Sequence, residues 1–160
     1  MVWLSGAKTN FRTTQIGSVF NCFGIGKIVK GNSQFEVGSY IFGNVGTSNY
    51  LIFDNYRKVE CFVVPKELVE MYGPEKFLYY INNGLAAYAG YEILNPEIGE
   101  TVIVSTASGA TGLILCELLK KKKKSKIIGL TSEKKIAELK KFVDIAANYS
   151  KKEELSEILK

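Results

Sequence analysis

The chain has 160 residues, of which 46% are hydrophobic and 23% charged, and its formal charge at pH 7 is +5. This length suits one ordinary domain or two small ones, and the composition is typical of a folded protein rather than a disordered one. Because the sequence contains no histidine, it excludes a Ser-His-Asp triad, a Cys/His zinc site and an imidazole general base.

The positive charge is spread along the chain rather than gathered in one basic region. Lys120 to Lys124 form one local run, and the lysines near the C-terminus alternate with glutamates. This pattern favours solvated helix faces over a nucleic-acid partner, so we expect no nucleic acid to bind. No apolar run approaches the roughly 20 residues of a membrane span, so no membrane association is expected.

The cysteine pattern indicates a reducing compartment. Cys22, Cys61 and Cys116 are scattered without metal-ligand spacing. An odd number of unpatterned cysteines is typical of proteins that are not stabilised by disulfides. We therefore expect a cytoplasmic location and no bound metal.

The first 65 residues indicate a β-rich segment. The runs SVFNCF, GKIVKG, GSYIFGNV and SNYLIFD alternate with Gly, Asn and Ser, which predicts tight hairpins in a small barrel or sandwich. Pro65 and Pro74 bracket a short helical stretch, KELVEMY. From Pro74 to Leu94, aromatic and aliphatic residues recur at helical spacing, with a break predicted near Asn82 to Gly84. These aromatics are interpreted as core packing.

After Gly99 the sequence alternates between strands and helices. The expected elements are a strand over 101–105, a helix over 110–123, a strand over 126–130, a helix over 133–142, a strand over 144–148 and a helix over 151–159. Ser132 is the expected N-cap of the fourth element. The first strand is wholly apolar, which predicts burial on both faces. This order predicts an α/β fold with a doubly wound parallel sheet.

The segment TVIVSTASGATG connects the first of these strands to its helix through small residues. A helix N-terminus attracts anions, and small side chains let a pyrophosphate approach its backbone N–H groups. Gly109 would allow the tight turn, and Gly112 would let the helix pack close to the strand. The spacing is T-x-x-G-x-x-G, with Thr106 at the usual first glycine. An ordinary strand-to-helix turn is the alternative.

The end of the second strand bears on which dinucleotide would bind. An acidic residue there would bind the ribose hydroxyls of NAD, but Thr131 and Ser132 occupy this point. Glu133 is followed directly by Lys134 and Lys135. Two hydroxyls and two ammonium groups favour a 2′-phosphate, and hence NADP over NAD. The alternative is that both lysines are simply exposed helix residues.

Four blocks in order resemble the zinc-independent medium-chain dehydrogenase/reductases, and especially their prostaglandin reductase and alkenal double-bond reductase group. The blocks begin with GSVFNCFGIGKIVKGNSQFEVGSYIFGNVGTSNYLI and NNGLAAYAGYEI. They continue with GETVIVSTASGATG and with SEKKIAELK followed by NYS. The resemblance implies a partial GroES-like β-barrel segment over 1–97 and the first half of a Rossmann NADP-binding domain over 98–160.

The implied activity is NADP(H)-dependent reduction of a carbon–carbon double bond conjugated to a carbonyl, in an enone or alkenal, or reduction of a quinone. By this resemblance, loop residues would contact the pyrophosphate, while Lys135 and Tyr149 would lie at the 2′-phosphate. The residues expected to bind the cofactor are Ser108, Gly109, Ala110, Thr111, Gly112, Ser132, Lys135 and Tyr149. No catalytic residue is identified, and a homo-oligomer is left open.

The chain also departs from the family pattern. Ser39 stands where the family has aspartate, and Ala86 where it has threonine. The glycine that ends the family's first Rossmann helix is replaced by the run KKKKKSK, which predicts a helix without a left-handed cap. Family members are about twice as long, so the chain is expected to be truncated at both ends. The alternative function is therefore a non-catalytic, truncated paralogue that binds nucleotide weakly or pairs with a full-length relative.

Overall fold

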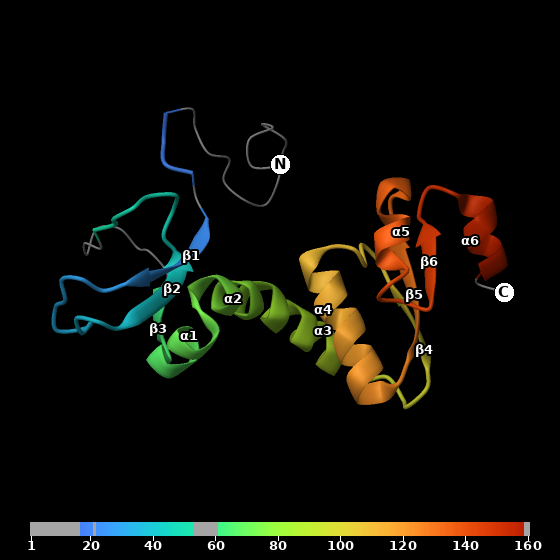
Figure 1. The fold of residues 1–160 in the computed structure, drawn as a ribbon, viewed down its shortest axis with the longest axis horizontal. Coiled ribbons are helices and arrows are strands. Elements are labelled where there is room, and N and C mark those ends of the chain that lie inside the picture. Colours follow the sequence, from blue (N-terminus) through green and yellow to red (C-terminus); the bar gives the residue numbers. More distant parts are fainter. Residues whose placement is uncertain (1–16, 21, 53–60, 159–160) are drawn as a thin grey trace. The chain divides into compact units, whose positions relative to one another are not determined.

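The computed structural model of the chain describes residues 17–20, 22–52 and 61–158. Its helices and strands are labelled in Figure 1. The chain divides into two compact units, the first ending at Leu78 and the second beginning at Tyr79. A different boundary is expected from the sequence, between residues 97 and 98, at the start of the expected nucleotide-binding domain. That boundary stays a prediction.

The first unit contains an antiparallel sheet of three strands in the order β1-β2-β3. The strands are β1 (Phe23–Lys27), β2 (Tyr40–Asn44) and β3 (Cys61–Val64). The prediction of a β-rich segment is confirmed for these strands, although the first begins only at Phe23, late in the run SVFNCF. The run SNYLIFD has no strand over residues 49–52, and its end lies outside the described residues.

The two faces of this sheet pack differently. On one face, Ile41 is buried, whereas Val63, its partner in β3, is 54% exposed. On the other face, the ring of Phe42 lies between Phe23 and Phe62, with centroid distances of 5.6 and 5.8 Å. The predicted helix KELVEMY is present as α1 (Lys66–Tyr72), directly after Pro65.

The helical stretch after Pro74 is continuous rather than broken. Helix α2 (Pro74–Tyr79) runs into the π-helical turn η2 (Tyr80–Gly84), which leads into α3 (Leu85–Leu94). The break expected near Asn82 is therefore wrong, because the chain there widens its turn instead of leaving the helix. Helix α3 ends at Leu94 and is capped by Asn95, whose φ of 37° is left-handed.

The second unit contains a parallel sheet in the order β4-β5-β6 (Figure 1), which confirms the α/β class. Its strands are β4 (Thr101–Val104), β5 (Lys126–Thr131) and β6 (Ile145–Asn148). Helix α4 (Ala110–Leu118) and its π-helical end η3 (Leu119–Lys123) connect the first two strands. The second connection is η4 (Glu133–Lys135) and α5 (Ile136–Leu139), and α6 (Lys152–Ile158) follows β6.

The core of this unit lies between the sheet and its connecting helices. It consists of Val102, Val104, Ala107, Cys116, Leu119, Ile127, Leu139 and Val143. Gly129 lies at its centre, since a Cβ there would come within 3.0 Å of Ala107, Leu139 and Val143 side-chain atoms. The helix predicted over 133–142 is shorter than expected, because α5 ends at Leu139 and Lys140 to Phe142 form turns.

Within the described residues, strand β4 is covered on one face only, so the prediction of burial on both faces is wrong. Val102 and Val104 are buried, whereas Ile103 is 50% exposed. The strand pairs only with β5 among the described residues. An edge strand covered by helices on one side exposes alternate residues, even where all of its side chains are apolar.

The helix after β4 does end in a left-handed residue, contrary to the prediction. Lys124 has φ 50° and ψ 33°, and its N–H donates to the carbonyls of Leu119 and Lys120. A lysine thus takes the backbone conformation that glycine adopts without strain. Within the described part of the chain, no helix is long and apolar enough to cross a membrane.

Candidate functional site

Three loops meet at the carboxyl edge of the parallel sheet. The N–H of Ala107, in the loop after β4, donates to the carbonyl of Leu130 in β5 at 3.0 Å. The hydroxyl oxygens of Ser108 and Thr131 share a hydrogen bond of 2.6 Å. After β6, the N–H of Tyr149 donates to the carbonyl of Thr131 at 3.1 Å. The structure therefore brings together Ser108 and the backbone of Tyr149 around the end of β5.

Thr106, the second residue after β4, has a backbone conformation unusual for its residue type. Its φ is 50°, which a β-branched residue adopts only at a cost in energy. The N–H of Gly109 donates to the carbonyl of Thr106 at 2.8 Å and closes the turn. Glycine, the usual first residue of this motif, adopts such a φ without strain. Thr106 takes the same conformation in its place.

Gly112 allows helix α4 to start very close to this turn. A Cβ at Gly112 would lie 2.6 Å from the carbonyl oxygen of Thr106 and 2.8 Å from the Cα of Ala107. Any larger residue would therefore push the helix away from the strand. This packing is the role expected for the last glycine of the motif.

The amino end of α4 has the properties that a pyrophosphate requires. Gly109 is the N-cap and has no side chain, and the first helical residues are Ala110, Thr111 and Gly112. The first N–H groups of an α-helix have no partner within the helix, and the helix dipole makes this end positive. The uncapped donors and small side chains fit an anionic group such as the pyrophosphate of a dinucleotide.

Two residues, the last of α2 and one in the π-helical turn η2, contact this helix end, which the sequence did not predict. The hydroxyl of Tyr79 donates to the carbonyl of Ala110 at 3.3 Å. The hydroxyl of Thr111 donates to Oδ1 of Asn83 at 3.4 Å. The side chain of Thr111 is therefore engaged within the protein. Only its N–H is left for the expected contact with the pyrophosphate. The aromatic and Asn-Asn pattern of 79–83 is the only sequence signal there, and by itself it predicts core packing and a helix break.

The remaining expected residues follow β5 and β6. Ser132 is the N-cap residue of η4, as predicted, but no side-chain capping bond forms in this described segment. Its carbonyl instead accepts the N–H of Lys135 at 3.0 Å. Lys135 is exposed at the end of η4, and the side chain of Tyr149 is 58% exposed. Both side chains are therefore open to a ligand at this edge.

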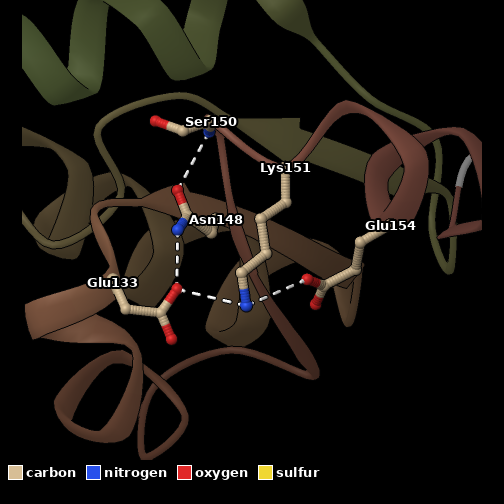
Figure 2. Close-up of polar contacts among 5 residues, drawn as sticks. All are labelled: Glu133, Asn148, Ser150, Lys151 and Glu154. Atoms are coloured by element: carbon tan, nitrogen blue, oxygen red, sulfur yellow. Dashed lines mark hydrogen bonds and ion pairs between the residues drawn. The ribbon is translucent and has the colours of Figure 1, made fainter.

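Glu133, which follows Ser132 directly in the chain, already has partners within the protein (Figure 2). It accepts a hydrogen bond of 2.6 Å from Nδ2 of Asn148 and lies 3.3 Å from Nζ of Lys151. The hydrogen bond from Asn148 and the proximity of Lys151 lower the pKa of Glu133 below its usual value. The network of Glu133, Asn148 and Lys151 was not anticipated from the sequence.

The chain is similar in sequence to two kinds of reductase. It is 31% identical to the 2-alkenal reductase (NADP(+)-dependent) of Nicotiana tabacum, an alignment that covers 90% of this chain and 42% of the relative. Over 80 residues, 48% of this chain and 24% of the relative, it is 44% identical to prostaglandin reductase 1 of Bos taurus. The chain thus spans less than half the length of these curated relatives. No family model matches it.

Solved structures share its fold. The structure of CurA from Vibrio vulnificus in complex with NADPH superposes with a TM-score of 0.71 at 24% identity, over 98% of this chain and 47% of that one. The quinone oxidoreductase of Coxiella burnetii gives a TM-score of 0.59 at 19% identity, over 82% of this chain and 42% of that one. At these identities the likeness establishes the fold.

Proposed function

We propose that this chain, a member of the medium-chain dehydrogenase/reductase family, binds NADP(H) at the carboxyl edge of its parallel sheet. It would serve as the nucleotide-binding part of a zinc-independent oxidoreductase that reduces conjugated double bonds of alkenals or enones, or quinones. The observation that carries the proposal is the uncapped start of α4 beside the Thr106 turn. This geometry supports binding of a pyrophosphate by backbone N–H groups.

The comparisons support the choice of cofactor and of reaction. The tobacco relative is named as NADP(+)-dependent, and the Vibrio structure is an NADPH complex. Bound NADPH would supply the hydride for reducing the conjugated double bond. This chain would contribute orientation, since α4 fixes the pyrophosphate and Lys135 offers a cation to the 2′-phosphate. The proposal includes a cytoplasmic location, which the three free cysteines support.

Titration of the chain with NADPH and NADH, followed by nicotinamide fluorescence, tests the proposal. We expect saturable binding of NADPH and weaker binding of NADH. Lys135→Gln should weaken NADPH binding about tenfold, because it removes a charge-assisted contact to the 2′-phosphate. NADH binding should stay the same in this variant, because NADH has no 2′-phosphate.

A lysine far from the site provides the matched control. Lys122 lies in η3, at the opposite end of α4 from the proposed pyrophosphate site. Lys122→Gln changes the net charge of the chain by the same amount as Lys135→Gln. If both variants weaken NADPH binding equally, the effect is general electrostatics and the 2′-phosphate role is wrong. If NADPH does not saturate a chain that circular dichroism shows to be folded, the binding proposal fails.

A further inference from the structure

Glu133 is the first carboxylate after β5, close to the position at which an acidic residue affects the choice of dinucleotide. It is two residues beyond Thr131, the last residue of β5. In dinucleotide-binding folds, an acidic residue at the end of the second strand accepts hydrogen bonds from the adenosine ribose and favours NAD. A free carboxylate here would also repel the 2′-phosphate of NADP. The position and the partners of the Glu133 carboxylate therefore affect the preference between NAD and NADP.

Asn148 holds Glu133 from one side in a fixed orientation. It is the last residue of β6 and is only 7% exposed. Its Oδ1 accepts the N–H of Ser150 at 2.9 Å, which leaves Nδ2 to donate to Glu133 (Figure 2). Reversing the amide would place Nδ2 against an N–H and Oδ1 against a carboxylate. The network therefore allows one orientation of Asn148, with its donor directed at Glu133.

Lys151 supplies the charge that offsets Glu133. Its Nζ lies 3.3 Å from a carboxylate oxygen of Glu133 and 3.7 Å from one of Glu154 (Figure 2). The backbone also holds it in place, because the N–H of Lys151 donates to the carbonyl of Asn148 at 3.1 Å. Asn148 and Lys151 together lower the pKa of Glu133, because both interactions stabilise its ionised form.

We propose that the network of Glu133, Asn148 and Lys151 sets the preference for NADPH over NADH. It holds the carboxylate away from the ribose hydroxyls and offsets its charge, so that Lys135 can bind the 2′-phosphate. Lys151 is then a positioning residue that acts on the cofactor through Glu133. This inference rests on the proposed NADP(H) site.

Replacing Lys151 with methionine tests this role. In Lys151→Met the carboxylate of Glu133 loses its counter-charge and is freer to turn toward the ribose. We expect NADPH to bind more weakly and NADH more tightly. The ratio of the NADH to the NADPH dissociation constant should fall about threefold, in keeping with one exposed ion pair. Fluorescence titration with each nucleotide measures both constants.

Two variants separate the ion pair from a general loss of charge. Lys152→Met removes an exposed lysine one residue along the chain, and it should leave the ratio unchanged. Lys151→Arg keeps the positive charge and should keep the preference for NADPH. The pKa of Glu133, followed by carboxyl NMR without nucleotide, should rise in Lys151→Met and stay low in Lys152→Met.

A double variant asks whether Lys151 acts through Glu133 or binds the cofactor itself. In a Glu133→Ala background, Lys151→Met should no longer change the ratio, because the carboxylate it positions is gone. A ratio that still falls in this background would show that Lys151 contacts the 2′-phosphate directly, and it would overturn the inference.

The outcomes also distinguish this inference from the proposed function. If the wild-type chain binds neither nucleotide, the NADP(H) site itself is wrong. If the wild-type chain prefers NADPH but Lys151→Met and Lys152→Met give the same ratio, the site stands and the network does not set the preference. Thermal unfolding of each variant confirms that the compared proteins are folded.

Discussion

The two edges of the parallel sheet differ in chemistry, although the same helix joins them. At the carboxyl edge, hydroxyl groups and small residues surround the amino end of α4, and the Ser108–Thr131 hydrogen bond joins the loop after β4 to the end of β5. At the amino edge, the helix ends in the lysine run of η3. There Asp144 accepts the N–H of Ile127 at 2.8 Å and pairs with Lys120 at 3.6 Å.

Backbone strain does not distinguish these edges, because each has a left-handed residue other than glycine. Thr106 and Lys124 both have φ of 50°. The N–H of Lys124 donates to helix carbonyls, so the helix end is satisfied internally. Thr106 instead precedes a helix start whose N–H groups remain for a ligand. Available backbone donors therefore mark the candidate site, while strain and positive charge do not.

The largest expected effect concerns the close approach of α4 to the carboxyl edge. Gly112→Ala places a Cβ 2.6 Å from the carbonyl of Thr106, so the turn or the helix must shift. We expect a loss of about 2 kcal/mol in the free energy of unfolding. NADPH binding should weaken as well, because the shift moves the N–H groups of the helix start. Urea unfolding and fluorescence titration measure the two effects.

Gly90 provides the matched control for this substitution. It lies within α3, and a Cβ there would meet no atom within 4 Å. Gly90→Ala should therefore raise the free energy of unfolding by about 1 kcal/mol, since alanine favours the helix. If Gly112→Ala is stabilising to a similar degree, the close packing at the carboxyl edge is wrong.

The next prediction compares substitutions on the buried and the exposed face of β4, the strand that leads to this edge. Val104 is 5% exposed and Ile103 is 50% exposed. Val104→Thr buries a hydroxyl in the core and should lower the free energy of unfolding by about 2 kcal/mol. Ile103→Thr keeps the β-branched shape on an open face and should cost less than about 1 kcal/mol. Equal losses in urea unfolding would indicate that both faces of the strand are covered.

The amino edge should respond to acid through Asp144. The Ile127 N–H and the nearby Lys120 lower the pKa of this carboxyl. A lowered pKa means that its stabilisation is complete above the usual value of about 3.9, and it is lost as the pH falls through the lower folded value. Asp144→Asn should therefore be less stable than wild type at pH 7 by about 1 kcal/mol or less.

Unfolding measured from pH 7 to pH 2 checks this linkage. The gap in stability between wild type and Asp144→Asn should close as the pH falls, because the wild-type carboxyl becomes neutral. NADPH binding at pH 7 should be the same in both proteins, since Asp144 lies at the opposite edge from the proposed site. A gap independent of pH would show that charge is not how Asp144 stabilises the fold.

The sequence predicts the order of strands and helices in the second unit because each element follows a local rule. Short apolar runs lie in β4 and β5, and the small residues between Val104 and Leu113 form the turn and the start of α4. The exposure of Ile103 could not be predicted in this way. A wholly apolar strand has the same sequence whether one or both of its faces are covered, and only the neighbouring elements decide.

The loop after β4 is predictable from the sequence, whereas the side-chain contacts that surround it are less so. Gly109 and Gly112 are recognisable because few residue types fit a tight turn and a close approach. The support from Asn83 and the bond between Glu133 and Asn148 join residues far apart in the chain. Side chains of these types are common on surfaces, so spacing alone does not indicate such pairs. The lysine cap at Lys124 was missed because glycine is the usual signal.

The smallest expected effects come from relieving strain at each edge with the same substitution. Thr106→Gly and Lys124→Gly both place glycine at a φ of 50°. Each should raise the free energy of unfolding by about 0.5–1 kcal/mol, with the larger gain at the β-branched threonine, although the added freedom of glycine in the unfolded chain offsets part of it. Thr106→Gly should also strengthen NADPH binding, because it removes a side chain beside the helix start. Lys124→Gly should leave NADPH binding unchanged. Equal changes in NADPH affinity in the two variants would show that the carboxyl edge is not the binding edge. A loss of stability in both variants would show that neither residue is strained.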